Sequence, residues 1–355
     1  MRILIFSLSY FPHVGGAEVA VKEITDRASS IEFDMVTLRF DKSHPKFERL
    51  GNVNVYRIGG GLGYLSKIFF IPQAALFALR RKYDLYWCIM TYMLFPAVLS
   101  RKAPWILTLQ DGDPFTHVFN RLRILIFLPL LSYGFKHAKS VTAISNFLAK
   151  WSKRPDAIVI PNGVDTERFQ NVKHRVFDKN KIRLITTSRL VQKNGVEDII
   201  KSLKFLPENV TLRILGSGPL EKSLKLKANS LQLQNRIEFL GEIPHFDISK
   251  YLHEADIFIR PSLSEGMGNS FIEAMAAGLP VIGTPVGGIV DFLRDGETGL
   301  FCEVKNPKSI ADRVMEYINN PELTSQIVKN AKKMVQEKYD WNLIAREMRS
   351  RVFKV

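Results

Sequence analysis

The sequence predicts an α/β protein made of two doubly wound domains, each built on a parallel sheet. Short runs of β-branched residues alternate with amphipathic helical patterns along the whole chain, which is typical of βαβ units. The 355 residues are enough for two domains of roughly 150 to 200 residues each. The alternation stops at Pro161-Asn162-Gly163, and a polar stretch over 165–181 follows, so we expect the domain boundary there.

The first series of elements defines an N-terminal domain, which we place at residues 1–165. We expect its strands near residues 2–7, 32–38, 53–57, 84–89, 105–109, 140–144 and 157–160. The clearest helical patterns of this series fall at 17–28, 67–82 and 120–137.

The second series defines a C-terminal domain, which we place at residues 172–338. We expect its strands near 182–188, 211–215, 236–240, 256–260 and 280–283, each followed by a loop rich in Gly or Pro. Helices near 307–319, 321–338 and 340–354 follow these strands. In open α/β sheets a ligand binds outside the carboxyl ends of the strands, so two such domains imply a ligand in a cleft between them.

The apolar runs and the cysteine content exclude several classes of protein. The apolar run at 2–6 is interpreted as a buried strand and not a secretory signal, because it breaks at Ser7 without a small-residue cleavage site. No run of 18 apolar residues occurs, so we expect no membrane-spanning helix. Cys88 and Cys302 are too few and too far apart for a disulfide framework or a zinc site, which favours a reducing, cytoplasmic location.

The net charge of +15 requires an anionic partner: nucleic acid, an anionic membrane or a phosphorylated substrate. Between Arg101 and Lys153 the only acids are Asp111 and Asp113. The helical pattern at 120–137 has an apolar core too short to span a bilayer, and cations flank it. We interpret its apolar residues as buried and the cations as attracted to anionic lipid headgroups. Aromatic residues do not interleave with the cations as nucleic-acid binding would require.

The segment from Glu265 to Glu273 carries the strongest chemical signal. Gly266 and Gly268 allow close backbone approaches, and Asn269 or Ser270 is a suitable N-cap for a helix that ends near residue 277. A helix that begins in a glycine-rich loop at the carboxyl edge of a parallel sheet is an anion site, because its first N–H groups have no helical partner. We expect the N–H groups of Gly268, Asn269 and Ser270 to face a diphosphate.

The two carboxylates of this segment are given different roles. We expect Glu273 in the first turn of the helix, where it could accept hydrogen bonds from a ribose diol, and Glu265 in the preceding loop, free to reach a sugar. The alternative is a capped helix with two surface acids. Arg189 and Lys193, which leave another strand end just before a helix, could hold the diphosphate, although solvated loop cations are the alternative for them. The loop that begins at Gly216 would wall the same site.

Taken together, these motifs resemble those of the family 4 retaining glycosyltransferases of GT-B fold. The resemblance rests on Glu265 and Glu273 with seven residues between them, and on further motifs in the same order along nearly the whole chain. These are Gly15-Gly16-Ala17-Glu18, residues 160–165, Ser188-Arg189-Leu190-Val191 with Lys193, residues 215–219, Gly287-Gly288 and residues 295–299. The resemblance implies two Rossmann-like domains facing a cleft, with the helix at about 340–355, which contains Trp341, packed back on the first domain.

The resemblance also implies roles for individual residues. Glu265 would be the catalytic residue, Arg189 and Lys193 would bind the donor diphosphate, and Glu273 would bind the ribose. The loop of Gly15 and Gly16 would complete the phosphate site from the first domain, and the backbone around Ile243 would meet the base. The full set of expected substrate-binding residues is Gly15, Gly16, Gln110, Arg189, Lys193, Gly216, Ile243, Gly266, Met267, Gly268, Asn269, Ser270 and Glu273.

The sequence departs from the family at Gln110, where many relatives have a histidine that contacts the transferred sugar. Glutamine can donate and accept hydrogen bonds but does not titrate, so an acid–base role is excluded there. Asp111-Gly112-Asp113 imitates a metal-binding motif of another glycosyltransferase fold, but we expect a metal-independent enzyme without a cofactor, in which cations and helix dipoles supply the charge. His13 lies near the Gly15 loop and is kept as a weaker candidate.

These features predict a retaining hexosyltransferase that uses a UDP- or GDP-sugar. The expected acceptor is a lipid-linked saccharide or another cell-envelope glycan precursor, and the expected location is the inner face of the membrane, to which the basic first domain would attach peripherally. Retention could follow from attack on the same face as the leaving group or from a double displacement. A soluble acceptor, as in sucrose- or trehalose-type synthases, is the nearest alternative. A dinucleotide-dependent oxidoreductase would require a Gly-x-Gly-x-x-Gly motif after the first strand, and this sequence lacks that spacing. A basic nucleic-acid-binding protein is a further alternative.

Overall fold

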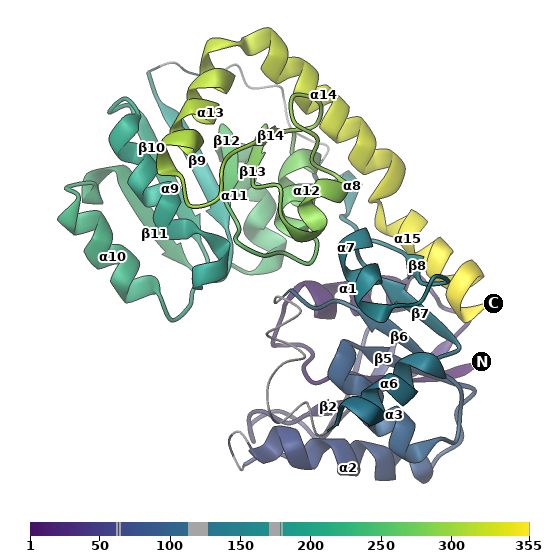
Figure 1. Cartoon of the computed structure of the whole chain (residues 1–355). Helices are drawn as coiled ribbons and strands as arrows, with labels where there is room; N and C mark the ends of the chain where they lie inside the picture. The colour runs from purple at the N-terminus through teal and green to yellow at the C-terminus, as the bar shows by residue number, and fades with distance from the viewer. Residues whose placement is uncertain (62, 64, 113–126, 170–177, 179, 355) are drawn as a thin grey trace. The chain divides into compact units, whose positions relative to one another are not determined.

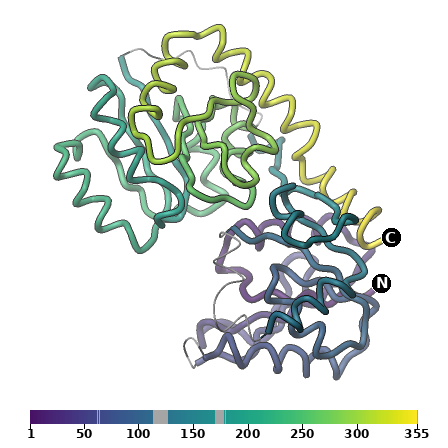
Figure 2. Tube along the Cα trace, in the orientation of Figure 1, coloured from purple at the N-terminus to yellow at the C-terminus, as the bar shows by residue number. Residues whose placement is uncertain are grey.

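A computed structural model describes the chain except residues 62, 64, 113–126, 170–177, 179 and 355. The chain forms two compact units (Figures 1 and 2). Unit 1 consists of Met1–Asn162 together with Trp341–Val355, and unit 2 of Gly163–Asp340.

The sheet of unit 1 has eight strands in the order β3-β4-β2-β1-β5-β6-β7-β8, and all neighbours are parallel except β3 and β4. The strands are β1 (Arg2–Phe6), β2 (Glu32–Leu38), β3 (Phe47–Leu50), β4 (Val53–Ile58), β5 (Leu85–Ile89), β6 (Trp105–Leu109), β7 (Ser140–Ala143) and β8 (Ile158–Val159). Strands β2 to β4 lie on one side of β1, and β5 to β8 lie on the other. The strand order therefore reverses between β1 and β5.

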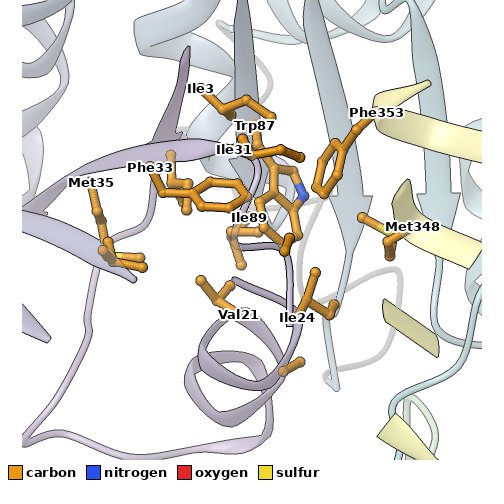
Figure 3. Packing of buried hydrophobic residues seen from close by; sticks show 14 of the residues in the cluster. Ile3, Val21, Ile24, Ile31, Phe33, Met35, Trp87, Ile89, Met348 and Phe353 are labelled. Carbon is orange, nitrogen blue, oxygen red and sulfur yellow. The ribbon is translucent and has the colours of Figure 1, made fainter. Parts of the chain in front are cut away.

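Helices cover both faces of this sheet. They are α1 (Gly16–Asp26), α2 (Leu65–Leu79), α3 (Leu94–Ser100), α6 (Leu128–Lys136), α7 (Asn146–Ala149) and α15 (Trp341–Glu347), with shorter turns at Thr91–Met93 and Lys150–Ser152 and a π-helical turn over Met348–Phe353. The core of one face contains side chains of α1, of the central strands and of α15 (Figure 3). On the other face α2 packs against β2 and β4, and α3 packs against α2, α6 and β5.

The segment Trp341–Val355 is part of the core of unit 1, which confirms that the last helix packs on the first domain. The Phe353 ring meets Trp87 edge-on with centroids 5.2 Å apart, and its centroid lies 6.1 Å from that of Phe33. Figure 3 labels all three side chains. Trp341 and Met348 are also buried. Strand β1, which lies at the centre of the sheet, and the C-terminal turn therefore share one hydrophobic cluster.

The sheet of unit 2 has six parallel strands in the order β11-β10-β9-β12-β13-β14. They are β9 (Ile182–Thr187), β10 (Val210–Leu215), β11 (Ile237–Gly241), β12 (Ile257–Arg260), β13 (Val281–Gly283) and β14 (Leu300–Phe301). The strand order reverses between β9 and β12, which pair directly through Leu184 with Ile257 and Ile185 with Phe258. The carboxyl ends of β9 and β12, on either side of this reversal, are where open α/β sheets bind ligands.

The helices of unit 2 are α8 (Thr166–Phe169), α9 (Val196–Ser202), α10 (Glu221–Ser230), α11 (Ile248–Glu254), α12 (Asn269–Ala276), α13 (Pro307–Asn319) and α14 (Pro321–Lys338). Shorter turns occupy Gln192–Asn194, Leu203–Phe205, Gln234–Arg236, His245–Asp247 and Gly287–Asp291. Helix α13 begins at a proline that follows an asparagine N-cap, two residues typical of a helix start. Pro307 fills the first helical position, and the Asn306 side chain accepts from the Ser309 N–H at 3.1 Å.

The α/β class with two parallel-sheet domains is confirmed. The sequence did not reveal β3, β14 or the short α3 and α7, because two- to seven-residue elements carry little periodicity. The helix expected over 120–137 is described only from Leu128, and the remainder of that range lies outside the described residues. No helix among the described residues is long and apolar enough to cross a membrane.

Candidate functional site

The candidate site of unit 2 is built on the two loops that leave β9 and β12. The loop after β9 contains Arg189 and Lys193, and the loop after β12 contains Glu265. The loops touch closely: a Cβ on Gly195, which has φ +68°, would lie 2.1 Å from the Pro261 carbonyl oxygen. Only glycine fits at this contact, so the sequence at 195 fixes how the two loops lie together.

Arg260, the last residue of β12, organises the site. Its Nη2 donates to Glu265 Oε2 at 2.5 Å and to Asn194 Oδ1 at 3.1 Å, and its Nη1 donates to Ser270 Oγ at 2.8 Å. The side chains of Arg260 and Glu265 are only 12% and 11% exposed, so this ion pair is largely shielded from water. Asn194 in turn donates to the Arg189 carbonyl oxygen at 2.6 Å. One guanidinium thus ties together both loops and the start of α12.

Glu265 is held by its backbone as well as by its carboxylate. Its Oε1 accepts from the Gly266 N–H at 3.1 Å, and its carbonyl oxygen accepts from the Gly288 N–H at 3.1 Å. A Cβ on Gly287, at φ +57°, would lie 1.9 Å from that carbonyl oxygen. Glycine at position 287 is therefore required for the loop after β13 to close over Glu265.

The start of α12 differs in detail from the expectation. The N-cap is Gly268 with φ +98°, and not Asn269 or Ser270, because the glycine turns the chain one residue earlier. A glycine N-cap has no side chain, and no side-chain cap hydrogen bond is described there. Gly266 and Met267 are buried beneath this turn, Asn269 is partly exposed, and Ser270 is buried against Arg260.

The expectation that Glu273 lies in the first turn of this helix is wrong. Because the helix starts at Asn269, Glu273 falls in the second turn, and the first turn contains no acid. Its Oε1 instead meets Nε2 of His245 at 2.8 Å. His245 follows β11 and lies two residues after Ile243, which is partly exposed. Glu273 and the segment expected to meet the base are therefore joined by one contact.

His245 is itself anchored from α8. Arg168 Nη2 donates to the His245 carbonyl oxygen at 2.6 Å, and it also donates to the carbonyl of Phe246. The Arg168 guanidinium lies 4.7 Å from the centroid of the Phe246 ring, which is 77% exposed. Sequence reasoning missed Arg260, Asn194, Arg168 and His245, and proximity to Ile243 was the only signal for His245.

The expected cations and the third loop lie at the same edge of the sheet. Arg189 is exposed and Lys193 is half-buried. A Cβ on Gly216, at φ +129°, would lie 2.0 Å from the Ser188 carbonyl oxygen, so the loop after β10 packs on the loop after β9. Among the described residues, Ser188 Oγ, Ser262 Oγ and Arg260 Nε are buried without a hydrogen-bond partner. Such groups are uncommon in folded proteins, and these three lie at the carboxyl ends of β9 and β12.

In unit 1 the Gly15-Gly16 loop follows β1, and both glycines are exposed. Gly15 caps α1, and its N–H donates to Glu18 Oε2 at 2.9 Å, while Ser9 Oγ donates to Glu18 Oε1 at 2.5 Å. Glu18 is 6% exposed. This carboxylate, from the third position of the helix, occupies the Gly15 N–H in the loop that was expected to complete the phosphate site.

Gln110 is buried directly after β6. Its Oε1 accepts from Asn162 Nδ2 at 3.2 Å. The neighbouring Asp111 is also buried and accepts from Thr91 Oγ1 at 3.1 Å, so this carboxylate has a structural partner. His13 is exposed and lies against the rings of Phe40 and His44.

No group of three or more potential metal ligands occurs among the described residues, and Asp113, the second acid of the Asp111-Gly112-Asp113 motif, lies outside them. Burial raises the pKa of the Cys302 thiol to about 12 and that of the Cys88 thiol still higher. Both thiols therefore stay protonated near neutral pH, which excludes them as nucleophiles.

Comparisons with known proteins match both units. Residues 167–334 match the family described as Glycosyl transferases group 1, and residues 14–168 match the one described as Glycosyltransferase Family 4. The chain is 27% identical to an uncharacterised glycosyltransferase of Methanocaldococcus jannaschii over 96% of this chain and 95% of that protein. It is 25% identical to N-acetyl-alpha-D-glucosaminyl L-malate synthase of Bacillus anthracis (94% and 92%) and 32% identical to the capsular polysaccharide biosynthesis glycosyltransferase CapM of Staphylococcus aureus (53% and 52%).

Solved structures show the same fold over the whole chain. Sucrose-phosphate synthase from Thermosynechococcus elongatus superposes with a TM-score of 0.84 at 19% identity, covering 98% of this chain and 97% of that one. HepE of Anabaena, in complex with UDP and glucose, gives 0.81 at 21% identity and full coverage of both chains. WaaG, a glycosyltransferase involved in lipopolysaccharide biosynthesis, gives 0.76 at 15% identity, covering 98% and 99%.

Proposed function

We propose that this chain, which belongs to the family 4 glycosyltransferases of GT-B fold, transfers a hexose from a UDP- or GDP-sugar to a lipid-linked saccharide or other cell-envelope glycan precursor, with retention of the anomeric configuration. The reaction would take place at the inner face of the membrane. The observation that carries the proposal is the shielded Arg260–Glu265 pair between β9, β12 and the uncapped start of α12. These elements meet where the strand order of the sheet reverses.

The donor would bind along this edge of unit 2. Its diphosphate would accept hydrogen bonds from the start of α12 and from Arg189 and Lys193, since a helix N-terminus and two cations together favour an anion. Glu273 would accept from the ribose, in an orientation fixed by His245. The base would contact the backbone around Ile243. HepE binds UDP and glucose, which supports a nucleotide-sugar donor for a chain of this fold.

The ion pair supports attack on the same face as the leaving group. In that reaction the bond between the anomeric carbon and the diphosphate oxygen breaks, and the acceptor oxygen forms a new bond to the same face of that carbon. The proton of the acceptor hydroxyl passes to the departing phosphate oxygen. Glu265 would position the sugar and stabilise positive charge that develops on it, while Arg189 and Lys193 stabilise the leaving group.

A double displacement would instead require Glu265 to attack the anomeric carbon. That carboxylate accepts from both Arg260 and the Gly266 N–H, and hydrogen bonds to a charged donor reduce its nucleophilicity. The contact with Arg260 would have to break before a covalent intermediate forms.

A lipid-linked acceptor is supported by the charge of the chain and by two relatives. CapM acts in capsular polysaccharide biosynthesis and WaaG in lipopolysaccharide biosynthesis. A soluble acceptor is the second candidate, because sucrose-phosphate synthase and the malate-glycosylating enzyme match over most of this chain. Vesicle cosedimentation separates the two candidates, since only the first requires membrane attachment.

The donor can be identified before any acceptor is known. A thermal-shift screen of UDP-, GDP- and ADP-sugars should show stabilisation by a UDP- or GDP-hexose, because a ligand that binds only the folded state stabilises it more as its affinity rises. Stabilisation and donor hydrolysis should persist in the presence of EDTA, as metal-independent chemistry requires. Stabilisation by ADP-sugars alone, or by no nucleotide-sugar, would refute the proposed donor. The anomeric coupling constant of the product, measured by NMR, tests retention.

A further inference from the structure

Helix α2 of unit 1 exposes an apolar stripe that the proposed catalytic chemistry does not use. Leu65 and Ile68 are 53% exposed, Leu76 is 52% exposed and Phe69 is 50% exposed. Spacings of three, four and eleven residues from Leu65 place all four side chains on one side of the helix. In Figure 1 this helix lies at the lower margin of unit 1, next to α3.

The opposite side of α2 is buried, so the stripe is not needed to hold the helix in place. Phe70, Ala74 and Ala78 are fully buried, and the helix packs against β2, β4 and α3. Leu99 of α3 is another half-exposed apolar residue. A helix that is apolar on all sides belongs in a protein core or in a membrane environment, yet one side of α2 faces outward.

Along the sequence, the charged residues of α2 and of the segment that follows it to Lys82 are all cations. The sequence contains no acid between Glu48 and Asp84, and none between Asp84 and Asp111. The C-terminal end of α2 runs into Arg80, Arg81 and Lys82, and Lys102 donates to the Leu79 carbonyl oxygen at 2.6 Å. The exposed cations of this region are Lys67, Arg80, Lys82, Arg101 and Lys102.

This combination selects an anionic lipid surface as the partner. An apolar stripe bordered by cations is typical of helices that lie in the plane of a membrane, with the apolar side among the acyl chains and the cations at the headgroups. Fifteen residues span about 22 Å as a helix, which is too short to cross a hydrocarbon core of about 30 Å. A nucleic acid would match the cations but would leave Leu65, Ile68 and Leu76 in water.

We propose that α2 docks unit 1 on anionic membranes, with Leu65, Ile68, Phe69 and Leu76 inserted below the headgroups. The inference builds on the proposed membrane-side reaction, and it adds a lipid contact on α2 to the one expected from the cations that flank the helical pattern at 120–137. The stripe supplies insertion and the cations supply attraction, with each cation contributing about fivefold in binding.

Vesicle cosedimentation of the full chain tests this proposal. Vesicles of equal parts phosphatidylcholine and phosphatidylglycerol should sediment the protein, and vesicles of phosphatidylcholine alone should sediment much less of it. The triple change Ile68→Ser, Phe69→Ser and Leu76→Ser should weaken binding to the anionic vesicles by at least about tenfold, because it removes three inserting side chains. Since these side chains face outward, thermal unfolding should remain cooperative.

The matched control changes two equally exposed apolar residues of unit 2, Phe205→Ser and Leu226→Ser, which are 52% and 60% exposed. This control should bind vesicles like the unchanged chain. Equal vesicle binding by the triple variant and the unchanged chain would overturn the proposal. A dimer that the triple change converts to a monomer, without any change in vesicle binding, would overturn it in favour of a second copy of this chain.

The outcome is independent of the donor chemistry. The triple variant should keep its stabilisation by the nucleotide-sugar and its donor hydrolysis, since α2 carries none of the site residues of unit 2. If the unchanged chain binds anionic vesicles but no nucleotide-sugar stabilises it, the proposed function fails and the docking surface stands. If nucleotide-sugars stabilise it and the triple change leaves its binding to anionic vesicles unchanged, the docking surface fails alone. If nucleotide-sugars stabilise it and anionic vesicles do not bind it, the docking surface and the membrane-side acceptor fail together, and the nucleotide-sugar donor stands.

Discussion

Helices α1 and α12 each begin at a glycine N-cap but have different first turns. Each follows a strand beside a reversal of strand order, and each has a glycine at its N-cap, Gly15 or Gly268. In α1 the chain supplies its own anion: Glu18 accepts from the Gly15 N–H at 2.9 Å. In α12 the first turn has no acid, and Arg260 holds the nearest preceding carboxylate, that of Glu265.

The comparison teaches that a glycine-led helix start is not enough to define a phosphate site. An acid at the third helical position fills the positive end of the helix from within. Phe271 occupies that position in α12, so the dipole of this helix is left for a ligand. In helices that start at a glycine, the residue at the third helical position therefore separates a start capped by its own side chain from a start suited to an anionic ligand.

The largest expected effect is that of Glu265→Gln. The substitution keeps the shape but removes the charge beside Arg260, so transfer should fall on the order of 10³-fold, as when other preorganised electrostatic groups are removed. Stabilisation by the nucleotide-sugar should survive. The control Glu221→Gln changes a partly exposed first-turn acid of α10 and should leave transfer unchanged. Unchanged turnover of Glu265→Gln would show that Glu265 has no role in the transfer step.

Arg260→Met should have the next largest effect. It leaves Glu265 as a shielded carboxylate without its cation, which costs about 3 kcal/mol in the free energy of unfolding. We expect kcat to fall by about 10- to 100-fold, with a smaller change in the KM for the donor, because Arg260 acts by positioning Glu265. Arg260→Lys should restore part of kcat. Equal loss of kcat in both variants, with unchanged stability, would contradict a positioning role.

Gly268→Ala and Gly15→Ala form a direct test of the two helix starts. At Gly268, φ is +98° and the new Cβ would lie 3.0 Å from Phe271 Cδ2, so the change should cost about 1 to 3 kcal/mol of stability and weaken donor binding. At Gly15, φ is −135° and the close contact is with the flexible end of Glu18, so the cost should stay within about 0.5 kcal/mol. Urea unfolding and thermal shift with donor measure both. Similar losses at the two positions would break the comparison.

The smallest expected effect is that of Glu18→Ala. Loss of the capping carboxylate should lower the free energy of unfolding by about 1 kcal/mol. Donor stabilisation should not decrease, because the Gly15 N–H becomes available. Ser9→Ala, which removes only the second hydrogen bond to Glu18, should cost less and serves as the graded control. A fall in donor stabilisation with Glu18→Ala would assign that carboxylate to the ligand.

Most of the fold was predictable, because strand and helix periodicities are local properties of the sequence. The alternation of β9 to β13 with their loops follows from runs of β-branched residues and from glycines, and the position of Glu265 at a carboxyl edge follows from parallel topology. The sequence placed the start of α12 one or two residues late, because asparagine and serine are preferred over glycine at the N-cap. The chain turns at Gly268 instead, since φ there is +98° and glycine adopts this conformation without strain.

The partners of the carboxylates could not be predicted in the same way. Arg260 reads in the sequence as the last residue of a strand, and only the structure shows that its side chain turns toward Glu265, Asn194 and Ser270. His245 lies 28 residues before Glu273, with a helix and a strand between them. The apolar sequence of α2 likewise did not reveal which side faces outward, because both sides have similar composition.

The return of the C-terminal segment to unit 1 has a consequence for biosynthesis. Unit 2 is one continuous stretch of chain, whereas unit 1 is assembled from stretches made before and after it. Phe353, which fills the space beside Trp87 and Phe33, leaves the ribosome after all of unit 2. The unit that is translated first is therefore completed last. In a nascent chain its core lacks the side chains of the C-terminal segment until unit 2 has been translated.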